Sequence, residues 1–121
     1  MFQLDNIYKI IYDTLAPLGY ITKEQGTFPK ETVLPETYIT YFLIDSPNTS
    51  HADNKPTSTT SRIQLVLYSK KPSLKQNADK LLMSVMLPGG FLRVGGRDLP
   101  FNADTGHYAR TCDYRYYEEE E

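Results

Sequence analysis

Two stretches of this chain decide its fold: Thr-Tyr-Ile-Thr-Tyr-Phe-Leu-Ile-Asp at residues 37–45 and Arg-Ile-Gln-Leu-Val-Leu-Tyr-Ser at residues 62–69. The first is dense in β-branched and aromatic residues, which favour strands. In the second, Ile63, Leu65 and Leu67 alternate with residues of the opposite face, which is the pattern of a half-buried strand. We therefore place the remaining elements around two central strands.

The residues before this pair predict an amphipathic helix. Apolar residues recur from Leu4 to Leu18 at the spacing of one helix face. We expect the helix to end near Ala16, because Pro17 disfavours helical geometry in the residue before it. Gly19 can then supply a positive φ just beyond the helix.

A second helix is expected after the central strands, from Leu74 to about Leu87. Ser73 and Gln76 have the spacing of a capping box, and apolar residues follow at helical period. Pro88 and the two glycines after it should stop this helix.

Three weaker strands complete the pattern. Residues 20–23 predict a short strand, and residues 91–105 predict another short strand followed by a turn-rich excursion through Gly95 and Gly96. Residues 107–117 predict a closing strand, in which Arg110 interrupts a series of core-facing residues. That series is Tyr108, Cys112, Tyr114 and Tyr116.

The order of these elements predicts an α+β fold, with an antiparallel (mixed) sheet of about four to five strands and two α-helices packed on one face. We expect a single domain over residues 1–117, followed by an acidic tail at residues 118–121. The net charge of the whole chain is −2, so the four glutamates of the tail leave a body near neutral. Such a body argues against strong non-specific nucleic-acid binding, which needs clustered Lys and Arg.

The amino-acid composition also indicates in which cellular compartment the protein is expected. Cys112 is the single cysteine, which excludes an internal disulfide and favours a reducing environment. We find no signal peptide and no run of about 18 apolar residues, so we expect a soluble, intracellular protein without a membrane span.

The sheet face away from the helices should carry large apolar side chains. Alternation in the first central strand forces one of two apolar sets onto that face, and Val66 and Tyr68 of the second strand add to it. Either this face associates with a partner, as open apolar patches usually do, or loops fold over and hide it. Residues 46–61, almost wholly polar, are expected to form a long loop.

Candidate catalytic or metal-binding residues are few. His51 and Asp53 form a His-x-Asp pair, with His107 elsewhere, but the closely spaced second pair typical of a metal site is missing. Cys112 is expected to be a buried core residue and not a nucleophile. We therefore predict no enzyme activity, no metal and no cofactor.

Arginines gather in the last third of the chain, at Arg93, Arg97, Arg110 and Arg115. They could face a partner, DNA or acidic neighbours. A solvated strand surface is the alternative that we favour, because aspartates nearby offset their charge.

The chain resembles the small tail-completion or head–tail joining (tail terminator-like) proteins of long-tailed phages and prophages of Gram-positive bacteria. The likeness spans nearly the whole chain, although nothing between Gly89 and Thr105 matches. It rests on an amphipathic first helix, Leu-Gly-Tyr at 18–20, Tyr-Phe-Leu-Ile-Asp at 41–45, Ala-Asp-Asn at 52–54, Ile-Gln-Leu-Val-Leu-Tyr-Ser at 63–69, a helix, and Asp-Tyr-Arg-Tyr-Tyr at 113–117.

This resemblance implies a structural protein that forms a ring, typically of six subunits, between the tail tube and the head connector. Its partners would be itself and those two proteins, in the host cytoplasm during assembly and then at the virion head–tail interface, with DNA passing through the lumen without specific binding. The implied partner-binding residues are Tyr38, Phe42, Val66 and Tyr68 on the sheet, and His51, Asp53, Asn54 and Lys55 in the loop. We add Arg93 and Arg97 to the predicted partner-binding residues from the arginine cluster.

Two other classes of function stay open. A nucleic-acid- or protein-binding module would use the arginines and tyrosines, and its affinity for nucleic acid would fall steeply with salt. A small enzyme would need His51, Asp53 and His107 to converge in one pocket.

Overall fold

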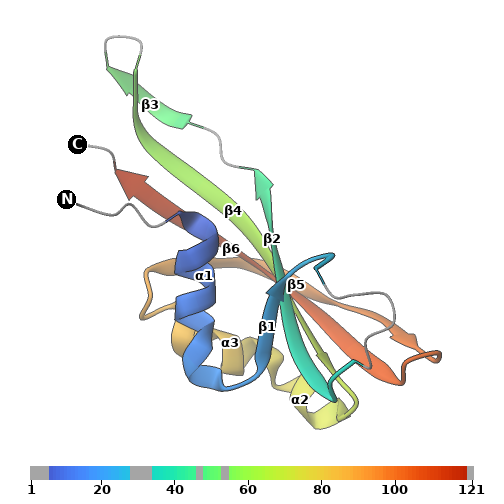
Figure 1. Cartoon of the computed structure of the whole chain (residues 1–121). Helices are drawn as coiled ribbons and strands as arrows, with labels where there is room; N and C mark the ends of the chain where they lie inside the picture. Colours follow the sequence, from blue (N-terminus) through green and yellow to red (C-terminus); the bar gives the residue numbers. More distant parts are fainter. Residues whose placement is uncertain (1–5, 28–33, 46–47, 53–54, 120–121) are drawn as a thin grey trace.

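The computed structural model describes residues 6–27, 34–45, 48–52 and 55–119, with the backbone alone for 48–52, 55–59 and 119 (Figure 1). The elements are α1 (Ile7–Leu15), η1 (Ala16–Leu18), β1 (Ile21–Glu24), β2 (Thr37–Asp45), β3 (Asn48–Ala52), β4 (Lys55–Ser69), α2 (Pro72–Gln76), α3 (Ala78–Met86), β5 (Phe91–Asn102) and β6 (His107–Glu119).

The strands form one mixed sheet in the order β1-β2-β4-β6-β5, and β3 pairs with the first part of β4. β1 and β2 run parallel, and the other pairs are antiparallel. The helices pack against this sheet, with α1 and α3 on the same side (Figure 1). The α+β prediction is confirmed.

The core lies between this sheet face and the two longer helices. Ile39 and Tyr41 of β2 face the helices, so Tyr38 and Phe42 belong to the other face. Apolar burial of this kind supplies most of the driving force for folding. The fully buried core side chains include Ile11 and Leu15 of α1, Ile63, Leu65 and Leu67 of β4, Leu82 and Met86 of α3, Phe91 of β5, and Cys112 and Tyr114 of β6.

The end of the first helix matches its prediction. Asn6 caps α1, since its side-chain oxygen accepts a hydrogen bond of 2.9 Å from the Lys9 backbone N–H. The α-helix ends at Leu15 and continues as the short 3₁₀ helix η1, and Gly19 follows with a φ of 80°. Leu4 lies outside the described residues.

The prediction of one long second helix is wrong. The chain instead forms α2 and α3, with a break at Asn77, whose φ of −100° and ψ of 10° leave the helical region. Its side-chain amide donates a 2.9 Å hydrogen bond to the Ser73 carbonyl. Helix α2 begins at Pro72, so Ser73 lies inside it and does not cap it.

The prediction of a long polar loop over residues 46–61 is also wrong. Residues 48–52 are strand β3, and β4 begins at Lys55, so the two form a hairpin that we call the arm (β3 and residues 55–61 of β4). The arm projects beyond the rest of the sheet (Figure 1). Its strands form because β6 is long enough to pair residues 58–61 with residues 116–119, two of which belong to the expected acidic tail.

Residues 91–102 form one continuous strand, which corrects the predicted turn-rich excursion. The strand tolerates its two glycines because a bulge lies between Arg93 and Gly95, and because Gly96 sits against the neighbouring strand. A Cβ at Gly96 would lie 2.5 Å from the Thr111 carbonyl oxygen. The glycine therefore permits close approach of two strands and does not mark a turn.

Candidate functional site: the open sheet face

The sheet face opposite the helices, which we call the open face, brings together five of the ten predicted partner-binding residues. Its members come from four strands in register: Tyr38, Thr40 and Phe42 of β2, Gln64, Val66 and Tyr68 of β4, Ala109, Thr111 and Asp113 of β6, and Arg97 and Leu99 of β5. Side chains of paired residues share a face, so register alone places them there.

This face is less open than its sequence suggests. Tyr38 is 6% exposed and Val66 3%, while Phe42 and Tyr68 are half-buried. The Tyr38 and Tyr68 rings stack, with centroids 4.6 Å apart. Burial, with a smaller contribution from Tyr68, raises the pKa of Tyr38 to about 12.

A polar belt divides the apolar residues of the open face. Gln64 donates a 3.1 Å hydrogen bond to Asp113, and the Thr111 hydroxyl lies 3.2 Å from both the backbone N and the carbonyl oxygen of Arg97. Exposed apolar side chains also lie on the far side of this belt, at Leu92 and Tyr117. The expected contiguous apolar patch is therefore interrupted.

One end of the open face lies against residues 34–35, just before β2. His107, 2% exposed, has its Nε2 2.8 Å from the Pro35 carbonyl oxygen, and its ring meets Tyr38 edge-on. Beside it lies a cavity of about 270 Å³, the His107 pocket. Its described lining consists of Leu34, Tyr38, Tyr68, Leu99, Pro100, Asn102, Thr105, His107 and Ala109.

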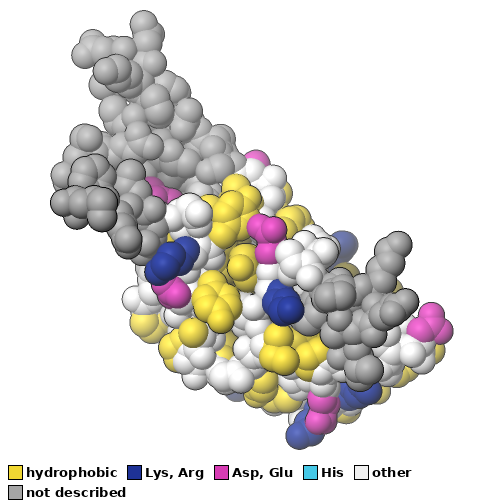
Figure 2. Space-filling model, viewed as in Figure 1, with side chains coloured by type: hydrophobic (Ala, Val, Ile, Leu, Met, Phe, Trp, Pro, Cys, Tyr) yellow, Lys and Arg dark blue, Asp and Glu magenta, His cyan; other side chains and the backbone are white. Residues whose placement is uncertain are grey.

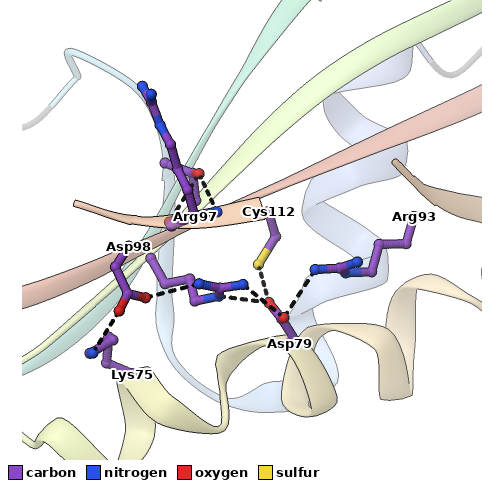
Figure 3. Close-up of polar contacts among 8 residues, drawn as sticks. Lys75, Asp79, Arg93, Arg97, Asp98 and Cys112 are labelled. Atoms are coloured by element: carbon purple, nitrogen blue, oxygen red, sulfur yellow. Dashed lines mark hydrogen bonds and ion pairs between the residues drawn. The ribbon is translucent and has the colours of Figure 1, made fainter. Parts of the chain in front are cut away.

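Arg93 does not lie on the open face. It pairs with Asp79 of α3 at 3.0 Å, on the helix side of β5 (Figure 3). Arg110 makes two further hydrogen bonds to Asp79, of 3.0 and 3.1 Å, and one of 2.9 Å to Asp98, which Lys75 also contacts. This Asp79 cluster ties α2 and α3 to β5 and β6.

The charges of the cluster shift its acid–base properties. Hydrogen bonds from Arg110, above all, hold the pKa of Asp79 below its ordinary value, and those from Lys75 and Arg110 do the same for Asp98. Cys112 donates a 3.1 Å hydrogen bond to Asp79. Burial, then Asp79, raises the pKa of this thiol to about 12, which leaves it a poor nucleophile at neutral pH.

The polar residues of the expected loop lie far from this face. His51 pairs with Pro56 near the tip of the arm, and Lys55 begins β4, while Asp53 and Asn54 lie outside the described residues. About 40 Å of strand separates the His51 end of β4 from the end beside His107, at about 3.3 Å a residue. These two histidines therefore do not converge.

Asp79 escaped the sequence analysis because it is 31 residues from Arg110 along the chain. The available signal was Arg110 itself, a charged residue in a core-facing series, since a charge drawn toward a core needs a partner. Among the described residues, no group of three or more His, Cys, Asp or Glu could hold a metal ion, and no helix is long and apolar enough to cross a membrane.

The side of the molecule that carries α1 is a mixed surface. Apolar side chains there alternate with charged and other polar ones over α1 and the neighbouring sheet edge (Figure 2). Tyr8, Tyr12 and Ile21 are exposed on these elements. No protein-family model and no curated protein sequence matches this chain.

Proposed function

We propose that this protein is a structural component of a phage head–tail junction, which joins or terminates the tail tube by self-association into a ring. The observation that carries this proposal is the arm. Strand β4 has 15 residues, and β2 pairs only with its last eight, from Arg62 to Ser69, so the arm occupies the part of β4 beyond β2. It projects away from both longer helices (Figure 1).

An exposed arm of this kind favours assembly. Within the described chain, the outer edge of β3 pairs with no other strand, so its N–H and C=O groups can accept a strand from another chain. The sequence of the arm is polar, which suits a contact made through the backbone. In a ring, such a contact joins one surface of each subunit to a different surface of the next.

The remaining surfaces fit the same role. Phe42 and Tyr68 offer half-buried aromatic area on the open face, and Arg97 adds an exposed cation to the same face on β5. The body of the chain is close to neutral, which suits a lumen through which DNA passes without being gripped. The tail-tube and head-connector proteins are the expected partners.

Most of the arm can be removed without changing a core residue. Residues 48–59 would be replaced by Asn-Gly, a dipeptide that favours a two-residue hairpin turn between Pro47 and Thr60. The matched control carries Lys80→Ala at an exposed position of α3 and keeps the arm unchanged.

Each protein would be mixed with the tail-tube protein of the same phage genome and examined by pull-down and negative-stain electron microscopy. We expect the full-length protein and the control to bind tube ends as rings, and the armless variant to fold without binding. If the armless variant binds as well as the full-length protein, the arm has no role in assembly. Absence of binding by the full-length protein, with a monomeric mass throughout, would contradict the function itself.

A further inference from the structure

Beyond the polar belt, one row of paired residues on the open face contains three charges. Asp45 of β2, Arg62 of β4, Arg115 of β6 and Leu92 of β5 are paired across the sheet in that order. Residues directly opposite in neighbouring strands have Cβ atoms about 4.5–5.5 Å apart, so the two arginines bring like charges together. Like charges in this position are unfavourable, and an anion bound beside them relieves the repulsion.

The two arginines of this row differ in their partners. Arg62 forms an ion pair of 3.5 Å with Asp45. The Arg115 side chain is exposed, and it forms no ion pair or hydrogen bond with the part of the chain that the structure describes. The row therefore carries one positive charge in excess, and that charge lies on Arg115.

Arg115 also lines a cavity of about 300 Å³, which we call the Arg115 pocket. Its described lining consists of Thr60, Gly90, Leu92, Arg115 and Tyr117. Leu92 is 59% exposed and Tyr117 58%, the highest fractions among the large hydrophobic side chains of the described residues. The volume lies at the lower end of the ~300–1,000 Å³ of ligand pockets, so it suits a side chain or two of a partner.

A carboxylate is the anion that this arrangement fits best. The planar guanidinium group of arginine can donate two parallel hydrogen bonds to the two oxygens of a carboxylate. Leu92 and Tyr117 add apolar and aromatic area beside it, so the bound segment should carry an apolar side chain as well. Asp45 and Asp113 lie on the same face and would repel the closely spaced phosphates of a nucleic acid.

We propose that the Arg115 pocket is a docking site for an acidic peptide segment of a partner protein. A Glu or Asp carboxylate of that segment pairs with Arg115, and a neighbouring apolar side chain packs against Leu92 and Tyr117. A second copy of this chain is a poorer occupant, because its cluster of glutamates begins within β6, directly after Tyr117. The site does not depend on ring formation.

The test titrates the full-length protein with the peptide acetyl-Gly-Glu-Phe-Glu-Gly-amide, followed by ¹H–¹⁵N NMR. Two matched peptides replace both glutamates by glutamine, or the phenylalanine by alanine. We expect a dissociation constant of about 0.1–1 mM for the first peptide, increasing with salt because the contact is exposed. Each replacement should weaken binding at least about threefold, because it removes either the charge or the apolar contact.

Two variants locate the binding. Arg115→Met should lower the affinity at least about fivefold and abolish the preference for glutamate over glutamine. Arg97→Met is the matched control, since Arg97 is an exposed cation of the same face outside the pocket, and it should change the affinity less than about twofold.

Three results would overturn the proposal. The first is no binding of the glutamate peptide to the wild-type protein at millimolar concentration. The second is an equal loss of affinity in the folded Arg115→Met and Arg97→Met proteins, which would show general attraction to positive charge. The third is tighter binding of a hexathymidine oligonucleotide than of the glutamate peptide, which would indicate a nucleic-acid site.

Discussion

Arg110 of β6 and Asp79 of α3 are joined by two hydrogen bonds, of 3.0 and 3.1 Å, at the boundary between helix and sheet (Figure 3). Both side chains are partly buried, with 23% and 29% of their surface exposed. The pair fixes α3 on the sheet, because Arg93 and Cys112 converge on the same carboxylate.

Removing this arginine should destabilise the fold. Arg110→Met keeps much of the apolar stem but leaves Asp79 with fewer donors, and we expect a loss of about 1.5–3 kcal/mol in the free energy of unfolding. Arg115→Met, on the same strand and the opposite, exposed face, should change it by less than about 0.5 kcal/mol. Urea denaturation measures both. Equal losses would mean that the Asp79 cluster contributes nothing specific.

Acid should lower the free energy of unfolding by protonating the Asp79 carboxylate. The pKa of Asp79 in the folded state lies below its ordinary value of 3.8, chiefly through hydrogen bonds from Arg110. The unfolded chain therefore binds this proton more readily, so the stabilisation is complete above about pH 5 and is lost as the pH falls through 3.8 and then through the folded pKa. In the Asp79→Asn variant, the free energy of unfolding should fall less steeply at acid pH, as measured by urea denaturation from pH 7 to 2.5. Parallel curves for variant and wild type would refute this assignment.

Substitution of two adjacent glycines by alanine should have different effects on the stability of the protein. A Cβ at Gly96 would lie 2.5 Å from the Thr111 carbonyl oxygen, whereas one at Gly95 has nothing within 4 Å. We expect Gly96→Ala to cost about 1–3 kcal/mol, since backbone must move, and Gly95→Ala to be neutral or slightly stabilising. Thermal unfolding of the two variants compares them directly. A Gly96→Ala protein as stable as the wild type would show that β5 and β6 are farther apart.

The cysteine should be unreactive until the protein unfolds. Cys112 is fully buried, and its thiol pKa is raised to about 12, so the thiolate is scarce at pH 8. We expect labelling by a disulfide reagent to follow the rate of unfolding, while Ser84→Cys, at an exposed helical position, adds a rapidly labelled thiol. Fast labelling of the folded wild-type protein would contradict this burial.

The sequence predicted the elements whose pattern reflects their own burial. The first helix and the core-facing series on β6 show the periodicity of one buried face, and the two central strands are rich in β-branched, aromatic and other apolar residues. The arm and the continuation of β5 through its glycines were missed for a different reason. Residues 55–61 become a strand through pairing with β3 and β6, and Gly96 is required by a carbonyl of a distant residue, so neither has a local signal.

The candidate site was predictable in part. Alternation predicted that one of two apolar sets of β2 joins Val66 and Tyr68 on the face away from the helices, and the register shows that this set contains Tyr38 and Phe42. The burial of Tyr38 depends on the segment near Pro35 and on His107, contacts that join residues 72 apart in the chain. Only the folded chain could show them.

The mass of the purified protein over a concentration series tests the proposed assembly most directly. Light scattering coupled to size exclusion should show growth from the 13.9 kDa of one chain toward a ring, about 83 kDa for six subunits, either alone or when tail-tube protein is added. A mass of 13.9 kDa at every concentration, unchanged by the tail-tube protein, would contradict it.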